Sequence, residues 1–149
     1  MVLPVLFAWY LAKNGYVSSI LMDNLRDRKI IYIITFVFYL ATLFVLSGFE
    51  VPSPIYKYAF GSTMTVGVLF VLALVKKKLS AHLAALGGMV GALSMLSIRL
   101  HTDFMALIYS LVFLAGIVAI ARIEVGAHKE NEIYWGFLLG FFAQIFIYI

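Results

Sequence analysis

The chain has 149 residues, of which 64% are hydrophobic and only 12% charged, with a formal net charge of +4 and a mean hydropathy of +1.06. No soluble single domain needs that much apolar surface, so the composition excludes an ordinary soluble protein and predicts a membrane protein. Cysteine is absent, which excludes disulfides and thiolate metal sites. The positive charge gives little support to nucleic-acid binding, because basic residues in short loops set membrane topology.

Six apolar runs predict an all-α bundle of about six transmembrane helices, forming one domain over residues 1–149. The runs cover residues 1–12, 30–48, 58–75, 79–98, 104–121 and 133–149. A span needs about 20 residues, with some latitude, so the last five runs are long enough. The first is short and fits a tilted or truncated helix or a signal-like segment. The helix is preferred, because no convincing small-residue cleavage pattern follows.

Polar links separate these runs and differ in character. A dense charge cluster with Arg26, Arg28 and Lys29 precedes the second run. Pro52 and Pro54 make the next link a turn, because proline stops a helix and restricts the residue before it. Three lysines, residues 76–78, end the third run, and residues 99–103 form a tight link after the fourth. Residues 122–132 form a polar island between the last two runs.

Six spans place alternate links on opposite sides of the membrane. The links around residues 26–29, 76–78 and 122–132 then share one side, called here the active face, and the other two lie opposite. Nine Lys and Arg residues fall on the active face and two on the other: Lys13, Arg26, Arg28, Lys29, Lys76, Lys77, Lys78, Arg122 and Lys129, against Lys57 and Arg99. This bias predicts a cytoplasmic active face, although cations that bind a ligand would produce the same bias.

The polar island holds one arginine, one histidine, one lysine and three glutamates, which makes it a functional-site hypothesis by default. His128 in the island and His82 at the start of the fourth run lie on the active face beside basic residues, whereas His101 lies opposite and is predicted to be a surface loop residue. Arginine and lysine suit phosphate, and free N–H groups at a helix start favour an anion. These features together predict a phosphate site at the membrane surface.

The pattern Arg122-x5-His128-x3-Glu132, followed by Gly136 and Gly140, resembles the third motif of the type 2 phosphatidic acid phosphatase superfamily. That motif usually reads Ser-Arg-x5-His-x3-Asp before a glycine-containing helix. Ser80-Ala81-His82 opens the fourth run where the family has Pro-Ser-Gly-His. Lys78-x-Ser80-Ala81-His82 is similar to a shorter bacterial branch. The resemblance covers about the last half of the chain.

The resemblance implies an integral membrane phosphatase of the bacterial inner membrane, acting on a lipid phosphate monoester or an isoprenoid diphosphate. In that family scheme His128 attacks phosphorus and becomes a phosphohistidine, Glu132 holds the imidazole, and His82 protonates the leaving oxygen. The residues implied to bind the phosphate are Arg122, Arg26 or Arg28, Lys78 and Ser80. The scheme requires no metal and no cofactor.

The chain departs from the family in three places. The usual first motif, Lys-x6-Arg-Pro, has no match. Lys57 is a poor substitute because parity puts it on the opposite face, so Arg26, Arg28 or Lys29 is expected to supply the missing cation. Ala121 stands where the family has serine, which removes one phosphate hydrogen bond, and Glu132 replaces an aspartate, which keeps the carboxylate and lengthens its reach.

Other interpretations remain open. Lys76 and Lys77 also fit simple topology anchors, the Arg26 to Lys29 cluster fits a solvated, self-paired link, and His82 alone fits a structural histidine. A non-catalytic membrane protein that binds lipid phosphate or a partner through the same basic pocket is the main alternative, and a small transporter is less favoured because mid-depth ionisable residues are almost absent. The glycine pairs at 87/91 and 136/140 predict close helix packing and leave a homo-oligomer open.

Overall fold

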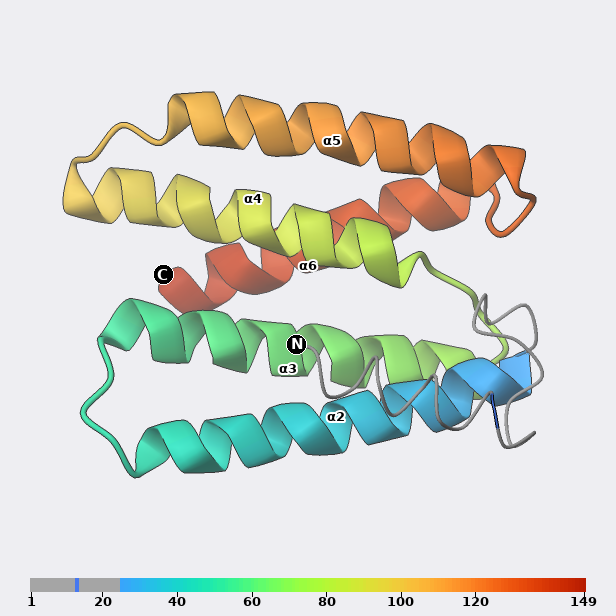
Figure 1. Cartoon of the computed structure of the whole chain (residues 1–149), viewed down its shortest axis with the longest axis horizontal. Helices are drawn as coiled ribbons and strands as arrows, with labels where there is room; N and C mark the ends of the chain where they lie inside the picture. The colour runs from blue at the N-terminus through green and yellow to red at the C-terminus, as the bar shows by residue number, and fades with distance from the viewer. Residues whose placement is uncertain (1–12, 14–24) are drawn as a thin grey trace.

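The computed structural model describes Lys13 and residues 25–149, which form a bundle of long helices joined by short links (Figure 1). The helices are α2 (Leu25–Ser47), α3 (Ser53–Leu74), α4 (Ala81–Leu100), α5 (Met105–Glu124) and α6 (Glu130–Tyr148). Pro54 lies in the first turn of α3, where a missing N–H costs no helical hydrogen bond. The apolar run predicted over residues 1–12 lies outside the described residues.

Four of the described helices, α2 to α5, are long and apolar enough to cross a membrane by length and composition. The fifth, α6, has 19 residues but begins with Glu130, Asn131 and Glu132 and carries Gln144 in its second half. The prediction of an all-helical membrane bundle therefore holds at this level. The prediction of six spans does not, because the described residues contain five helices, of which four meet the requirement.

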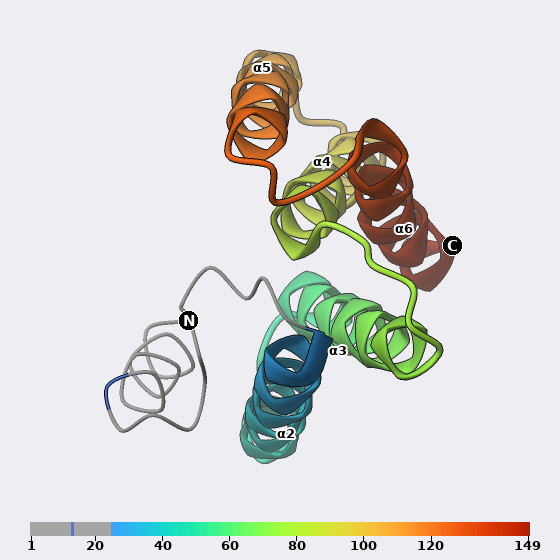
Figure 2. The ribbon, with the colours of Figure 1, turned by 90° about the vertical axis from the view of Figure 1, so that its right-hand side faces the viewer.

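Seen along its axis, the bundle is layered (Figure 2). α3 lies between α2 on one side and α4 and α6 on the other, and α5 lies against the outer side of α4. α2 and α5 are the outermost of the described helices, and large apolar side chains such as Phe44 and Phe113 stand exposed on them. Apolar side chains on such outer faces are what lipid contact requires.

Glycines let α4 and α6 approach each other backbone to backbone. A Cβ atom on Gly91 would lie 2.5 Å from the carbonyl oxygen of Phe141, and one on Gly136 would lie 2.7 Å from that of Ser80. Both distances are shorter than any real contact, so a side chain at either position would push the helices apart. The glycines of this interface are Gly87, Gly91, Gly136 and Gly140. The packing predicted from their spacing is confirmed.

The links also fall at the ends that parity predicts for the described helices. The start of α2, the α3–α4 link and the α5–α6 link share the right-hand end in Figure 1, and the α2–α3 and α4–α5 links share the left-hand end. Lys57 lies at this opposite end, with its Nζ 5.8 Å from the ring centroid of Tyr148. Arg99 donates to the backbone carbonyl of Tyr148 at the same end. Neither cation is therefore near the active face.

Candidate functional site

The turn between α5 and α6 explains the five-residue spacing between Arg122 and His128. Gly126 has φ +66°, a left-handed conformation that glycine adopts without strain. Its N–H donates to the Ile123 carbonyl at 2.9 Å, and the next N–H, of Ala127, donates to the Arg122 carbonyl at 3.1 Å, which is the Schellman pattern for ending a helix. The His128 N–H donates to the same Arg122 carbonyl at 3.3 Å. The chain thus folds His128 back against the last turn of α5.

His128 is buried, and its two ring nitrogens face groups of opposite charge. Nδ1 lies 2.8 Å from the Glu132 carboxylate, one helical turn further along the chain. Nε2 lies 3.4 Å from Nη1 of Arg28. A carboxylate only accepts hydrogen bonds and a guanidinium only donates them. The network therefore assigns the proton to Nδ1 and leaves a lone pair on Nε2, so the imidazole is neutral.

Glu132 is held in place by the start of α6. Its side chain reaches back to accept from the Lys129 N–H at 3.4 Å, which satisfies one of the free donors of the first helical turn. Its backbone carbonyl accepts from the N–H of Ser80 at 3.0 Å. That bond ties the beginning of α4 to the beginning of α6. These two bonds hold Glu132 where its carboxylate contacts the histidine.

The surroundings of His128 keep its pKa below the ordinary value of 6.5. Burial is the main cause, because it disfavours the charged imidazolium. The hydrogen bond to Glu132 acts in the opposite direction, and the guanidinium groups of Arg28 and Arg122 lower the pKa further. The balance favours the neutral ring that the hydrogen bonds indicate.

Arg28 is the member of the charge cluster before the second run that reaches His128. It is only 3% exposed, although α2 begins just three residues earlier. Tyr32, one turn further along α2, is buried beside it, and its hydroxyl hydrogen-bonds with Arg28. Of the cations Arg26, Arg28 and Lys29, Arg28 is the one whose described side chain lies at the histidine. Arg26 lies in the same helical turn, and its side chain is outside the described part.

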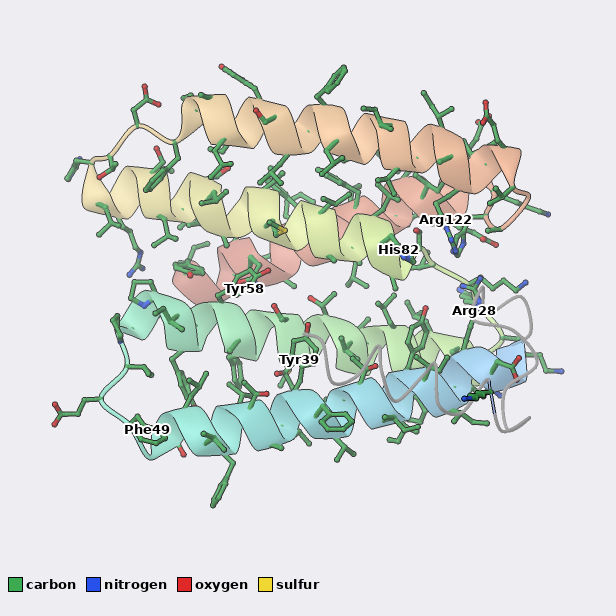
Figure 3. The ribbon with its side chains drawn as sticks, viewed as in Figure 1. Arg28, Tyr39, Phe49, Tyr58, His82 and Arg122 are labelled. Carbon is green, nitrogen blue, oxygen red and sulfur yellow. The ribbon has the colours of Figure 1, made fainter. Side chains whose placement is uncertain are left out.

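Two further sequence-predicted residues, Arg122 and His82, lie at the same end of the bundle as Arg28 (Figure 3). Arg122 is half-buried, and its Nε has no hydrogen-bond partner among the described residues. His82, in the first turn of α4, is exposed and lies within electrostatic range of both Arg122 and Arg28. Arg28, His82 and Arg122 come from three different helices and meet at the same end of the bundle. A buried guanidinium nitrogen with no partner is ready to bind an anion.

Ser80 stabilises the start of α4. It is fully buried, and its Oγ accepts from the Leu83 N–H at 3.5 Å as the N-cap of α4. Its own N–H is engaged by the Glu132 carbonyl. These contacts give Ser80 a positioning role at the junction of α4 and α6, whereas the resemblance implied that it binds phosphate directly.

The three lysines before Ser80 follow the end of α3. Lys76 has φ +61°, and the N–H groups of Lys76 and Lys77 donate to the carbonyls of Ala73 and Leu72 at 3.3 Å and 2.9 Å. This is a second Schellman turn, here with lysine in the position that favours glycine. Lys76 and Lys77 are exposed, as expected of topology anchors, and Lys78 is half-buried. Of these three lysines, only Lys78 is thus partly covered.

Sequence reasoning missed Tyr32 and Asp27. Tyr32 follows Arg28 by four residues, a spacing that puts both on one face of a helix, so the helical period was a usable signal. Asp27 is only 4% exposed in the first turn of α2, where a carboxylate suits the positive end of the helix dipole. Its burial could not be deduced, because it depends on how α2 meets the other helices. His101, by contrast, is exposed in the α4–α5 link as predicted.

Within the described ranges, no group of three His, Asp or Glu side chains is placed to hold a metal ion. The polar groups gathered here are instead two arginines, two histidines and one carboxylate, a set suited to an anion. Comparisons of the chain with protein-family models, with curated proteins and with solved structures find no match.

Proposed function

We propose that the protein is an integral membrane phosphatase that hydrolyses a lipid phosphate monoester or an isoprenoid diphosphate through a phosphohistidine intermediate. One observation carries this proposal: the buried His128 has its Nδ1 2.8 Å from the Glu132 carboxylate and its Nε2 3.4 Å from the Arg28 guanidinium. A neutral imidazole with a fixed tautomer is a prepared nucleophile, and the guanidinium beside it marks where a phosphate would sit. The resemblance of the surrounding motifs supports the same reading.

In the proposed reaction the phosphoryl group of the substrate displaces the Arg28–His128 contact. The Arg28 and Arg122 guanidinium groups bind the phosphoryl oxygens and stabilise the charge that develops on them. Nε2 of His128 forms a bond to phosphorus as the bond from phosphorus to the leaving oxygen breaks, and Glu132 stabilises the positive ring. His82 gives a proton to the leaving oxygen, then takes one from the water that hydrolyses the phosphohistidine.

The setting of the site supports a substrate that is anchored in the membrane. Arg28 and His82 stand at the ends of two helices that are apolar enough to span a bilayer, so a headgroup phosphate would meet them at the surface while its apolar chain stays in the lipid. We place the protein in the bacterial inner membrane with the active face in the cytoplasm, on the resemblance and on the excess of cations at that face.

The deciding experiment is phosphate release from a panel of lipid phosphates and diphosphates in detergent micelles, with EDTA present. Wild-type protein is expected to release phosphate, and both His128→Ala and His82→Ala are expected to lose at least about a hundredfold in rate, as for loss of a nucleophile or a general acid. His101→Ala is the matched control, because this third histidine is exposed at the opposite end. Release by His128→Ala at the wild-type rate would refute the mechanism.

A non-catalytic phosphate-binding protein is the second candidate, and the Arg28 contact is the observation that favours it. Arg28 covers the nitrogen that would have to attack, and the first motif of the family is absent. Such a protein would bind lipid phosphate with no turnover, and His128→Ala would leave binding largely intact while Arg28→Met and Arg122→Met weakened it. A well-folded wild-type protein that binds but never releases phosphate would establish this alternative.

A further inference from the structure

We infer that the cavity between α2, α3 and α4, completed by Gln144 of α6, is a second binding site, for a neutral ligand with an aliphatic body and a hydroxyl group. The inference goes beyond the proposed function and does not depend on it. The cavity has a volume of about 230 Å³. It begins beside Tyr32 and Ala81, under the phosphate site, and runs into the interior of the bundle as far as Tyr58 and Gln144.

The surface that faces the cavity is mostly apolar, but many of the side chains that line it also carry a polar group. Half of the lining residues carry a hydroxyl or an amide: Tyr32, Thr35, Tyr39, Tyr58, Ser62, Thr65 and Gln144. They follow the helical period on α2 and α3, so two hydroxyl-bearing faces line the same space; Figure 3 labels Tyr39 and Tyr58 on these two helices. No charged residue is among the described residues that line it. A charged ligand would therefore find no partner, whereas a neutral hydrogen-bonding ligand would.

Gln144 is the residue that most directly indicates a ligand site. It is only 1% exposed, and its amide packs over Gly61 of α3, where any side chain would collide with it. Its Nε2 donates to the Tyr58 carbonyl at 3.1 Å and to the Ser62 hydroxyl at 3.4 Å. Its Oε1 has no donor in the described part of the chain. A buried acceptor without a donor is costly, so the ligand must bring a hydrogen-bond donor of its own.

The apolar residues that line the cavity indicate an aliphatic body for the ligand. The apolar lining residues are Ile31, Val66, Leu69 and three alanines of α4. An aliphatic chain in the cavity would contact these side chains along its length. Ala85 lines the cavity and is itself exposed, so a lipid-borne ligand can enter beside α4. A long-chain alcohol combines the aliphatic body with the donor that Gln144 Oε1 lacks.

The test is a thermal-unfolding titration of the purified full chain in detergent with octanol and with its methyl ether, which has the same aliphatic body but no donor. A ligand that binds only the folded state raises the melting temperature as its concentration rises. Octanol is expected to bind about fivefold more tightly than the ether, the ratio that one neutral hydrogen bond supports. The same difference is expected in His128→Ala, because the cavity is separate from the nucleophile.

Two variants locate the binding. Gln144→Met is expected to remove the difference between octanol and the ether. Ala85→Leu adds volume where an exposed residue lines the cavity, and it is expected to weaken the octanol shift even if Gln144→Met fails to fold. Ala106→Leu, at an exposed position of α5, is the matched control. Equal shifts with octanol and the ether, no octanol shift because the cavity holds only water, or a full octanol shift in Ala85→Leu would each overturn the inference.

Discussion

His128 carries a carboxylate on one ring nitrogen and a guanidinium on the other, at 2.8 Å and 3.4 Å. The two neighbours act in opposite directions on the protonated ring, since Glu132 stabilises it and Arg28 destabilises it. Burial adds to the effect of Arg28 and decides the sign, so the ring stays neutral below the pH at which an exposed histidine takes up a proton. Burial, reinforced by the Arg28 side chain, thus sets the charge state of the proposed nucleophile.

This predicts the acid limb of the pH–rate profile. Because the pKa of His128 is held below 6.5, the acid limb of kcat/KM is expected to lie below pH 6.5. Arg28→Gln removes a cause that lowers the pKa, so the acid limb of its residual activity is expected to move to higher pH. A limb that stays in place or moves to lower pH in this variant would contradict the assignment. The measurement is kcat/KM over pH with one substrate.

The same lowered pKa predicts how stability depends on pH. The unfolded chain binds the proton more readily than the folded one, so the contribution of His128 to the free energy of unfolding is present in full above pH 6.5 and is lost as the pH falls through the folded-state pKa. As the pH falls from 7 to the folded-state pKa of His128, wild-type protein is thus expected to lose more stability than His128→Asn. Parallel losses in both proteins, measured by unfolding in detergent, would count against it.

At the scale of the helices, the α4–α6 interface holds the site together, because the Ser80 N–H bonds the Glu132 carbonyl at its active-face end. Gly140→Ala would bring a methyl group against the Ala84 carbonyl oxygen and the Gly88 amide, and is expected to lower the free energy of unfolding by about 3 kcal/mol. Gly116→Ala in α5 meets nothing within 4 Å and is expected to be neutral or to stabilise by up to about 1 kcal/mol. Denaturant titration in detergent compares them, and equal effects would refute the interface argument.

The turn that ends α3 gives a prediction of opposite sign. Lys76 adopts φ +61°, where a β-carbon is strained and glycine is not. Lys76→Gly is expected to raise the free energy of unfolding by up to about 1 kcal/mol, part of the gain being offset by the greater freedom of glycine in the unfolded chain. Lys77→Gly lacks the positive φ and is expected to bring no gain. If both variants lose stability equally, the Schellman geometry at this turn is wrong.

For the whole molecule, the up-and-down order of the described helices predicts which links share a side of the membrane. The chain has no cysteine, so single substitutions report accessibility without background. Lys77→Cys and Lys129→Cys are expected to react with an impermeant thiol reagent from one side, and Glu50→Cys and Thr102→Cys from the other. In bacterial inner-membrane vesicles the first pair should be accessible from the cytoplasmic side. Reaction of all four from one side would exclude the membrane bundle.

The sequence by itself determined the helical class, the order of the links and the pairing of glycines, because hydropathy, parity and small-residue spacing are properties of neighbouring residues. It also singled out His128, Glu132, Arg122 and His82 through their motifs. The tertiary structure alone decided that Arg28 meets His128, one hundred residues away, that Ser80 is enclosed between α4 and α6, and that hydroxyl groups of α2 and α3 line one cavity with Gln144. These relations depend on how separate helices pack. A local sequence pattern cannot predict them, because it does not specify the distances between segments that are far apart in the chain.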